Sequence, residues 1–386
     1  MSPSRLSPGV TFVIVADTLW RHCPPAAHGG PRVEVRDDES KLLPGVPLIE
    51  SPLLPSLLDS LDQDEQRLAL DLHVNGFATL EFPDPDFDSA AERIKSALTP
   101  QLDIEGWRQS GWAINVGLRI QDAWRTNADV RRLAVNAQVQ ALLSRLYGRR
   151  AFPFQTLNFP VGTQQHYHSD AVHFSSVPQG FMCGVWVALE DISEQAGPLV
   201  YYPGSHKLPI LVNEHLGVTS FANIDPYDNY GRFEEVWRAL VDAAGLQRAT
   251  FCPHKGQAFI WAANLLHGGD RHRDPTRTRW SQVTHYFFDD CAYYTPLLSD
   301  PFCGSIFFRN GTIDISTGKQ VANRYVDRDI RRNSSRSRPL RRRLAALSCH
   351  TILIRHSIWR QTRMSPRREP TPSPTTSSSG VARVAS

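Results

Sequence analysis

Several features are scarce or missing in this chain of 386 residues, and most of these absences exclude a class of protein. Its six cysteines are scattered without a CxxC pair, which argues against a zinc knuckle and against a disulfide framework. No apolar stretch approaches the roughly 20 residues needed to span a bilayer. Neither a GxGxxG nor a P-loop pattern occurs, so a nucleotide-binding fold is not expected. No internal repeat is present either.

A secretory signal is also missing from the start of the sequence. The longest early apolar run, TFVIVA at residues 11–16, is short and has no basic leader beyond Arg5. No convincing small-residue cleavage site follows it. We therefore expect a cytoplasmic protein with free thiols and no membrane span.

The net charge of +3 hides an asymmetry along the chain. Residues 331–386 contain 13 Arg, one Glu and no Lys or Asp, so this tail carries +12 and the first 330 residues carry −9. An Arg/Ser/Pro-rich tail can attract nucleic acid or anionic lipid by charge alone. It lacks the interleaved aromatic residues of a folded RNA-binding module. We expect a disordered appendage and no nucleic-acid partner.

The rest of the chain divides into two parts. Residues 1–58 are proline-rich without sustained periodicity, which predicts an extended or poorly ordered N-terminal arm. Residues 59–330 then form one domain that begins with a helical layer. Helices are predicted at 62–76 and 86–98, and one or two more within 127–147; the first has a capping Asp62 and a terminating Gly76.

From residue 151 the pattern changes to short β runs separated by Gly, Pro and Asp turn signals. A helical insert at 233–246 interrupts them. Such a series predicts an antiparallel sandwich or barrel. The expected fold class is therefore mainly β with flanking helices, around a double-stranded β-helix (jelly roll, cupin-like) core. The runs from residue 151 are AFPFQTLNF, TQQHYHS, GFMCGVWVALE, PLVYYPG, QAFIWAA and RWSQVTHYFF, and an earlier strand, FATLEF, is predicted directly after the helix at 62–76.

One stretch, QQHYHSDAVHF at residues 164–174, concentrates side chains that bind divalent metals. On a strand, residues i and i+2 project from one face, which puts His168 and Asp170 together with Ser169 pointing away. A third ligand is offered by QAFIWAANLLHGGD, an apolar strand that leads into His267 and two glycines. Two histidines and one carboxylate make the facial triad of non-heme Fe(II) oxygenases.

A rival pair of ligands is His166 and His168, spaced as in cupins. Cupin sites generally add a glutamate a few positions later, and none follows here. Asp170 lies too close to His168 in the sequence to serve as that glutamate. We therefore prefer His168 and Asp170, with His166 as a hydrogen-bonded strand residue and His173 as a pocket-wall or surface residue.

A cation follows twelve residues beyond His267, where Arg279 opens the strand RWSQVTHYFF. A guanidinium there could bind a carboxylate in bidentate fashion, as a chelating 2-oxo acid requires at its far end. Arg277 is the alternative. Arg271 and Arg273 lie in a polar loop, where solvation is expected.

Taken together, these segments resemble the phytanoyl-CoA dioxygenase family of Fe(II)/2-oxoglutarate oxygenases, over roughly residues 60–290. The motifs, in order, are HYHSDAVHF, CGVWVALEDISEQAGPLVYYPGSHK, GQAFIWAANLLHGGD and RTRWSQVTHYFF. The resemblance implies that His168, Asp170 and His267 bind iron and that Arg279 binds the 2-oxoglutarate C5 carboxylate.

Two further positions are interpreted through the resemblance. Trp186 falls where the family often places an aromatic residue beside the cosubstrate, although an ordinary core tryptophan explains it equally well. The family often has a hydroxyl residue two positions after the distal histidine, where this chain has Gly269. One cosubstrate hydrogen bond is therefore missing from that position.

The implied activity is an oxidoreductase reaction with Fe(II), 2-oxoglutarate and O₂, releasing succinate and CO₂. Related halogenases leave the carboxylate position empty for chloride, so Asp170 favours hydroxylation of a small molecule. Desaturation and ring formation are alternative outcomes, because they depend on how the substrate is placed. The alternative class of protein is a non-catalytic cupin-like protein that binds metal or a small ligand. Residues 169–178 and 211–246 are the expected pocket walls, and no residue there selects a substrate.

Overall fold

A six-stranded antiparallel sheet forms the centre of the protein, in the order β1-β8-β5-β10-β3-β2. The computed structural model describes residues 42–110 and 118–330, so the first 41 residues and the Arg-rich tail lie outside the described residues. In chain order the strands are β1 (Phe77–Glu81), β2 (Ile120–Gln121), β3 (Ala151–Phe159), β5 (Met182–Ala188), β8 (Gln257–Ala262) and β10 (Ser281–Phe288).

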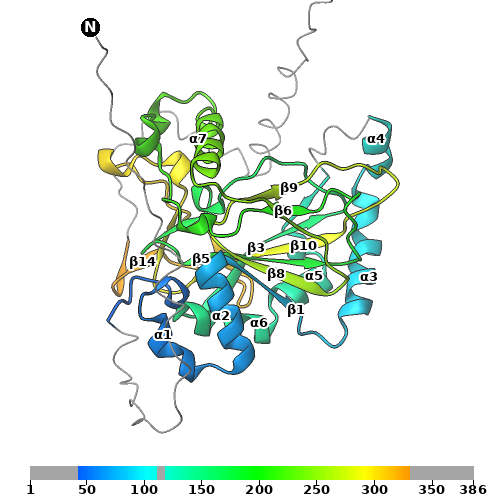
Figure 1. Cartoon of the computed structure of the whole chain (residues 1–386), viewed down its shortest axis with the longest axis horizontal. Coiled ribbons are helices and arrows are strands. Elements are labelled where there is room, and N and C mark those ends of the chain that lie inside the picture. Colours follow the sequence, from blue (N-terminus) through cyan, green and yellow to red (C-terminus); the bar gives the residue numbers. More distant parts are fainter. Residues whose placement is uncertain (1–41, 111–117, 331–386) are drawn as a thin grey trace, which may run out of the picture.

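A smaller three-stranded sheet lies over one face of the large sheet, with β6 between β7 and β9 (Figure 1). Its strands are β6 (Leu199–Tyr201), β7 (Ala249–Phe251) and β9 (His267–Gly269), and a separate pair joins β4 (Ser175–Val177) to β11 (Ala292–Tyr294). Leu199 and Tyr201 pack with Trp186 and Phe259 in a core between the two sheets. The predicted jelly-roll fold class is confirmed, with sheets that do not close into a barrel.

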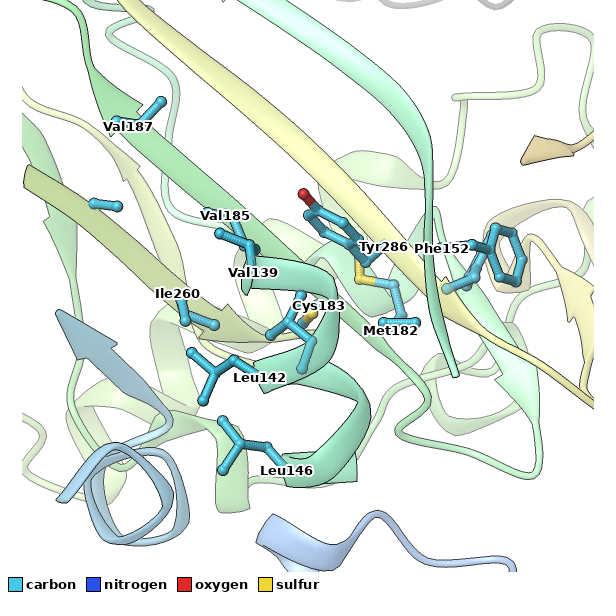
Figure 2. Close-up of a cluster of buried hydrophobic side chains, with 14 of the residues drawn as sticks. Val139, Leu142, Leu146, Phe152, Met182, Cys183, Val185, Val187, Ile260 and Tyr286 are labelled. Carbon is cyan, nitrogen blue, oxygen red and sulfur yellow. The ribbon is translucent and has the colours of Figure 1, made fainter. Parts of the chain in front are cut away.

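Strand β5 shows how alternation builds the two cores. Val185 and Val187 face the helical layer, whereas Trp186 faces the smaller sheet. Figure 2 shows the helical side, where Val139 lies beside Val185 and Leu142 belongs to the same hydrophobic cluster. Successive side chains of a strand point to opposite faces, and both faces of this sheet are covered. Every residue of β5 is therefore buried.

The predicted helices are confirmed with small shifts in their ends. Helix α2 (Gln63–Asn75) begins at Asp62, whose carboxylate accepts a hydrogen bond from the Glu65 backbone N–H at 2.9 Å. It ends at Gly76, whose φ of 80° suits glycine. The other predicted helices are α3 (Phe87–Leu98), α5 (Ala128–Ala134), α6 (Ala137–Tyr147) and α7 (Tyr230–Ala243). Helix α4 (Ile104–Gln109) was not predicted. Within the described ranges, no helix has the length and apolar character to cross a membrane.

Two segments differ from the sequence-based expectation. The predicted strand TQQHYHS is absent, and only His168 makes a β-bridge, to His267. A φ of 50° at Gln164 and the 3-10 helix η6 (Asp170–Val172) interrupt extended backbone on either side. The end of the predicted arm, residues 42–58, contains η2 (Leu48–Glu50) and α1 (Leu54–Leu57) and buries Ile49 completely.

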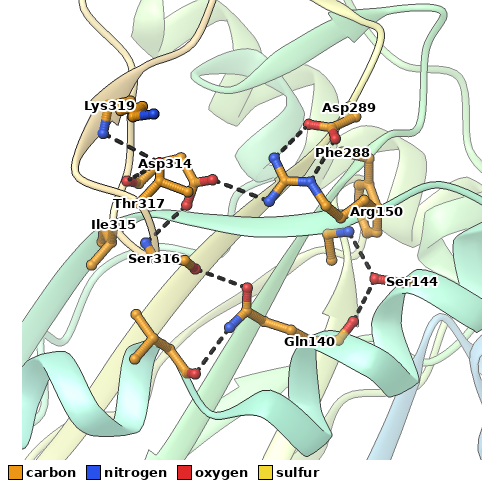
Figure 3. Close-up of polar contacts among 12 residues, drawn as sticks. Gln140, Ser144, Arg150, Phe288, Asp289, Asp314, Ile315, Ser316, Thr317 and Lys319 are labelled. Carbon is orange, nitrogen blue, oxygen red and sulfur yellow. Dashed lines mark hydrogen bonds and ion pairs between the residues drawn. The ribbon is translucent and has the colours of Figure 1, made fainter.

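The chain after β11 folds back over the domain and is fastened to it by polar contacts (Figure 3). Arg150 binds Asp289 through its Nε at 2.6 Å and Asp314 through its Nη1 at 3.1 Å. Ser316 donates a hydrogen bond to the Gln140 side chain at 2.9 Å. This anchoring holds β12 (Ile313–Asp314) against the domain, and the residues just before β12 form one wall of the cavity described next.

Candidate metal centre and its cavity

A cavity of about 440 Å³ lies between the two sheets. Strands β3 and β10 of the large sheet and β6 and β9 of the small sheet all contribute lining residues. Residues 307–313 close another side. All five residues that the sequence analysis assigned to the metal or cosubstrate line this space: His168, Asp170, Trp186, His267 and Arg279.

His168, Asp170 and His267 are all buried, and each offers one ligand atom within 4.8 Å of the other two. The Nε2 of His168 lies 3.6 Å from Oδ1 of Asp170, and the Nε2 of His267 lies 3.7 Å from Oδ2. One small ion could therefore contact all three side chains. Among the residues that the structure describes, no other group of this kind occurs.

Backbone pairing brings these distant residues together. The His168 N–H donates to the His267 carbonyl at 2.9 Å, and the His267 N–H returns a bond to His168 at 3.0 Å. Ser169 points away from the cluster, as predicted, and its hydroxyl donates to Asn264 at 2.8 Å. The turn before β9 is thus tied to the segment that carries His168.

The two glycines after His267 are required by the close approach of the segment at residues 163–167. A Cβ on Gly268 would lie 2.6 Å from the Gln165 carbonyl oxygen, and one on Gly269 would lie 2.7 Å from the Thr163 hydroxyl. Neither distance is compatible with a side chain at these positions. The hydroxyl that the family often carries at position 269 therefore cannot stand there, and Thr163 places a hydroxyl in the same region.

The protonation states of the cluster suit a cation. Burial lowers the pKa of His267 to about 4, so its imidazole is neutral at pH 7. Burial by itself would raise the pKa of Asp170, but the adjacent His267 and hydrogen bonds from His168 and His285 outweigh it. The pKa of Asp170 therefore lies well below its usual range. A neutral imidazole and an ionised carboxylate are the forms that bind metals.

Both histidines are oriented by their second ring nitrogen. The Nδ1 of His168 lies 3.1 Å from the carbonyl oxygen of His166, and that of His267 lies 3.0 Å from the carbonyl oxygen of Leu265. An N–H at Nδ1 satisfies each carbonyl and leaves the Nε2 lone pair directed at the cluster. This arrangement is common for metal-bound histidine.

Two residues that the sequence analysis missed hold the carboxylate of Asp170. Trp261 donates from its indole N–H to Oδ2 at 2.9 Å, and the Nε2 of His285 lies 3.4 Å from the same oxygen. Gly184 makes room for the indole, because a Cβ there would lie 2.1 Å from the Trp261 ring. His285 could have been found from strand parity, since it shares a face of β10 with Val283, and both line the cavity.

Arg279 enters the cavity without a polar partner for most of its guanidinium. It is 3% exposed, and its Nε and Nη1 have no hydrogen-bond partner among the described residues. Its Cζ lies 5.8 Å from the centre of the Trp186 ring. The alternative, Arg277, is exposed and bound to Asp274 at 3.1 Å, so it does not line the cavity. Burial lowers the pKa of Arg279 to about 10, which still leaves it charged at pH 7.

The two remaining histidines of the motif are separated from the cluster. His166 faces α7, where its Nε2 lies 3.2 Å from Nη2 of Arg238. His173 is a buried wall residue of the cavity, in contact with the rings of Tyr227 and Tyr230. Of the two predicted pocket walls, residues 169–178 supply Asp170, His173 and Phe174, whereas the insert at 211–246 supplies only Tyr227.

Comparison with known structures finds proteins that are similar to this chain at low sequence identity. The alpha-ketoglutarate-dependent epimerase SnoN from nogalamycin biosynthesis is 20% identical, with a TM-score of 0.42 over 60% of this chain and 85% of SnoN. EctD from S. alaskensis, solved with bound Fe, is 18% identical, with a TM-score of 0.45 over 67% of this chain and 86% of EctD. AviO1 from Streptomyces viridochromogenes is 16% identical, with a TM-score of 0.42 over 59% of this chain and 97% of AviO1. Among curated proteins, no match was found.

The sequence model of phytanoyl-CoA dioxygenase (PhyH) matches residues 85–279, which is half of the chain. The match includes the segments that carry His168, Asp170 and His267, and it ends at Arg279. The chain therefore belongs to the phytanoyl-CoA dioxygenase family of iron- and 2-oxoglutarate-dependent oxygenases.

Proposed function

We propose that this enzyme hydroxylates a small molecule at an iron bound by His168, Asp170 and His267. The observation that carries this assignment is the convergence of three buried ligand atoms within 4.8 Å of one another. The donor set fits Fe(II), because two imidazoles and one carboxylate form the facial triad of non-heme oxygenases. When bound, the iron would supply the activation of O₂ that the oxidation requires.

The protein supports such a site by fixing its ligands. Oδ2 of Asp170 accepts the indole N–H of Trp261, so the carboxylate is oriented before any metal binds. The pKa values leave His267 neutral and Asp170 ionised at pH 7, so no proton must be displaced from either group. The filled carboxylate position favours hydroxylation over halogenation.

We further assign Arg279 to the distal carboxylate of 2-oxoglutarate. A guanidinium that is buried without a carboxylate partner is costly, and an incoming carboxylate would remove that cost. Trp186 would form the wall beside the cosubstrate, since its ring lies next to the guanidinium. The hydroxyl of Thr163 could supply the hydrogen bond that Gly269 cannot. The reaction would convert 2-oxoglutarate and O₂ to succinate and CO₂, with one oxygen atom entering succinate and the other entering the substrate.

A non-catalytic metal-binding jelly roll is the weaker alternative. Such a protein has no need of a buried guanidinium beside its metal, and Arg279 provides one here. We also infer that the enzyme is cytoplasmic and that its reaction involves no nucleic acid. The described cysteines are all free, which agrees with a reducing compartment, and the cavity is of a size for a small molecule.

The test measures two quantities, Fe(II) affinity and 2-oxoglutarate-dependent succinate formation. His168→Ala and Asp170→Ala should each abolish succinate formation and weaken Fe(II) binding strongly, because each removes a ligand. His166→Ala is the matched control, since it removes a histidine two residues away that contacts Arg238 instead. Full turnover in either ligand variant would refute the assignment.

A further inference from the structure

A second group of arginines lines the cavity at a distance from Arg279. Arg309 extends from the segment after β11, and its Cζ lies 4.6 Å from the ring centre of Phe174 and 6.0 Å from that of Phe154. The Phe174 ring lies 5.1 Å from the ring of His285. Arg279 lies two residues before β10 and six positions before His285, which is about 20 Å of extended chain. The two guanidinium groups therefore serve different regions of the cavity.

The lining of the cavity is positive although the first 330 residues carry −9. Among the described residues, the lining arginines are Arg119, Arg125, Arg279 and Arg309, whereas the lining carboxylates are Asp122 and Asp170. Asp122 already accepts hydrogen bonds from the Trp124 indole at 3.1 Å and from a backbone N–H at 3.2 Å. Asp170 belongs to the metal cluster. Arginines thus outnumber carboxylates outside the metal and cosubstrate positions, and a locally positive cavity attracts anions.

His173 adds an unsatisfied polar group at the same place. It is 8% exposed, and its Nε2 has no hydrogen-bond partner among the described residues. Arg309 and Arg119 line the same cavity as His173. The Arg309 guanidinium lies over the ring of Phe174, the residue that follows His173. A buried ring nitrogen without a partner costs free energy, because its hydrogen bond to water is lost on folding. A ligand atom in the cavity would remove this cost.

Apolar side chains make up the remaining wall of this region. Phe154 and Phe174 contact each other at 5.4 Å between ring centres, edge to face. Phe307, Phe308 and Tyr227 also line the cavity. Aromatic walls of this kind bind an apolar or aromatic body, while a few polar groups fix its orientation.

We propose that the substrate is a small organic acid, whose anionic group is bound by Arg309, Arg119 and His173 and whose apolar body packs on Phe154 and Phe174. This inference rests on the proposed function, since it describes the substrate of the same iron site. A planar guanidinium binds carboxylate and phosphate alike, so either group can provide the negative charge. The arginine that selects this charge comes from a segment beyond the family match at residues 85–279.

The test uses three probes that share an apolar body and differ in charge: 3-phenylpropionate, 2-phenylethyl phosphate and the neutral 3-phenylpropanamide. Each is titrated calorimetrically into protein loaded with Fe(II) and 2-oxoglutarate in the absence of O₂. At least one anion should bind about tenfold or more tightly than the amide, which is about 1.4 kcal/mol. The preferred anion shows whether carboxylate or phosphate is the better fit.

Variants then locate the preference. Arg309→Gln should abolish the tighter binding of the anion relative to the amide, and His173→Phe should reduce this difference. Arg309→Lys should retain part of the difference, because it keeps the positive charge. Arg232→Gln is the matched control, because Arg232 is exposed on α7 and bound to Glu235 outside the cavity. Melting temperatures identify any variant that fails to fold, and the wild-type preference stands independently of the variants.

Two results would overturn the proposal. One is equal or tighter binding of the amide in the wild-type protein, and the other is no measurable binding of any probe at low-millimolar concentration. Fe(II) and 2-oxoglutarate binding are measured before the probes are added. If both bind and no anion is preferred, only the substrate class is wrong. If either fails to bind, the proposed function fails and this inference with it.

Discussion

Replacing Arg279 with methionine should weaken 2-oxoglutarate binding without destabilising the protein. Methionine fills a similar volume without charge. In the free protein, Nε and Nη1 of Arg279 are buried and have no hydrogen-bond partner within residues 42–110 and 118–330. Burial lowers the pKa of this guanidinium to about 10, which corresponds to about 3 kcal/mol against the charged form. Because pH 7 lies far below that pKa, the folded protein bears the full cost there.

Bound 2-oxoglutarate should turn the Arg279 guanidinium from a destabilising group into a stabilising one, because its carboxylate would pair with the charge. Loss of a buried, hydrogen-bonded charge partner costs about 2–4 kcal/mol. We therefore expect the Arg279→Met variant to bind 2-oxoglutarate about 30- to 1000-fold more weakly. Without cosubstrate, the melting temperature of the variant should equal that of the wild type or exceed it by a few degrees, because the substitution removes a buried charge. Most other substitutions in a protein core lower the melting temperature.

The measurements are thermal unfolding with and without 2-oxoglutarate, and calorimetric titration of the iron-loaded protein without O₂. Saturating 2-oxoglutarate should raise the melting temperature of the wild type and leave that of the variant almost unchanged. Arg277→Met is the matched control, since Arg277 is exposed and paired with Asp274. Unchanged cosubstrate affinity in Arg279→Met, together with a large loss of stability, would refute this reasoning.

Three further outcomes follow from the geometry. Trp261→Phe removes the N–H that binds Asp170 and should weaken Fe(II) binding about 10- to 100-fold. The control Trp237→Phe makes the same change elsewhere in the core, on α7, and should leave Fe(II) affinity unchanged. Equal Fe(II) affinities of the two variants in a metal titration would contradict this role of Trp261. Thr163→Val should raise the KM for 2-oxoglutarate with little effect on kcat and Thr163→Ser should not, so identical KM values would exclude a role for this hydroxyl. Burial lowers the pKa of His173 from 6.5 to about 3. Between these two pH values, the imidazole is protonated in the unfolded chain and neutral in the folded protein. The free energy of unfolding should therefore fall as the pH is lowered through this range, by up to about 1.4 kcal/mol per pH unit. His173→Phe should flatten this slope in urea unfolding, and an unchanged slope would show that the histidine is not buried in its neutral form.

Much of the fold could be predicted from local sequence patterns. Helix α2 has a capping Asp62 and a terminating Gly76, and both act as expected. Strand β5 reads as a continuous apolar run because both of its faces are covered. The segment around His168 was predicted as a strand and is not one, since Gln164 and Asp170 leave the extended region. The argument for the pair His168 and Asp170 assumed a strand, whereas the structure brings them together at a bridge followed by a 3-10 turn.

What the sequence determined by itself was the set of side chains with the right chemistry and their order along the chain. Ligand type and hydrophobic period are local properties, so His168, Asp170, His267 and Arg279 could be selected without coordinates. Only the tertiary structure decided which groups surround them. Trp261 reaches Asp170 because Gly184 leaves space on a neighbouring strand, and Arg309 reaches the cavity because the chain folds back after β11. Such contacts depend on the packing of segments far apart in sequence, which no local pattern records.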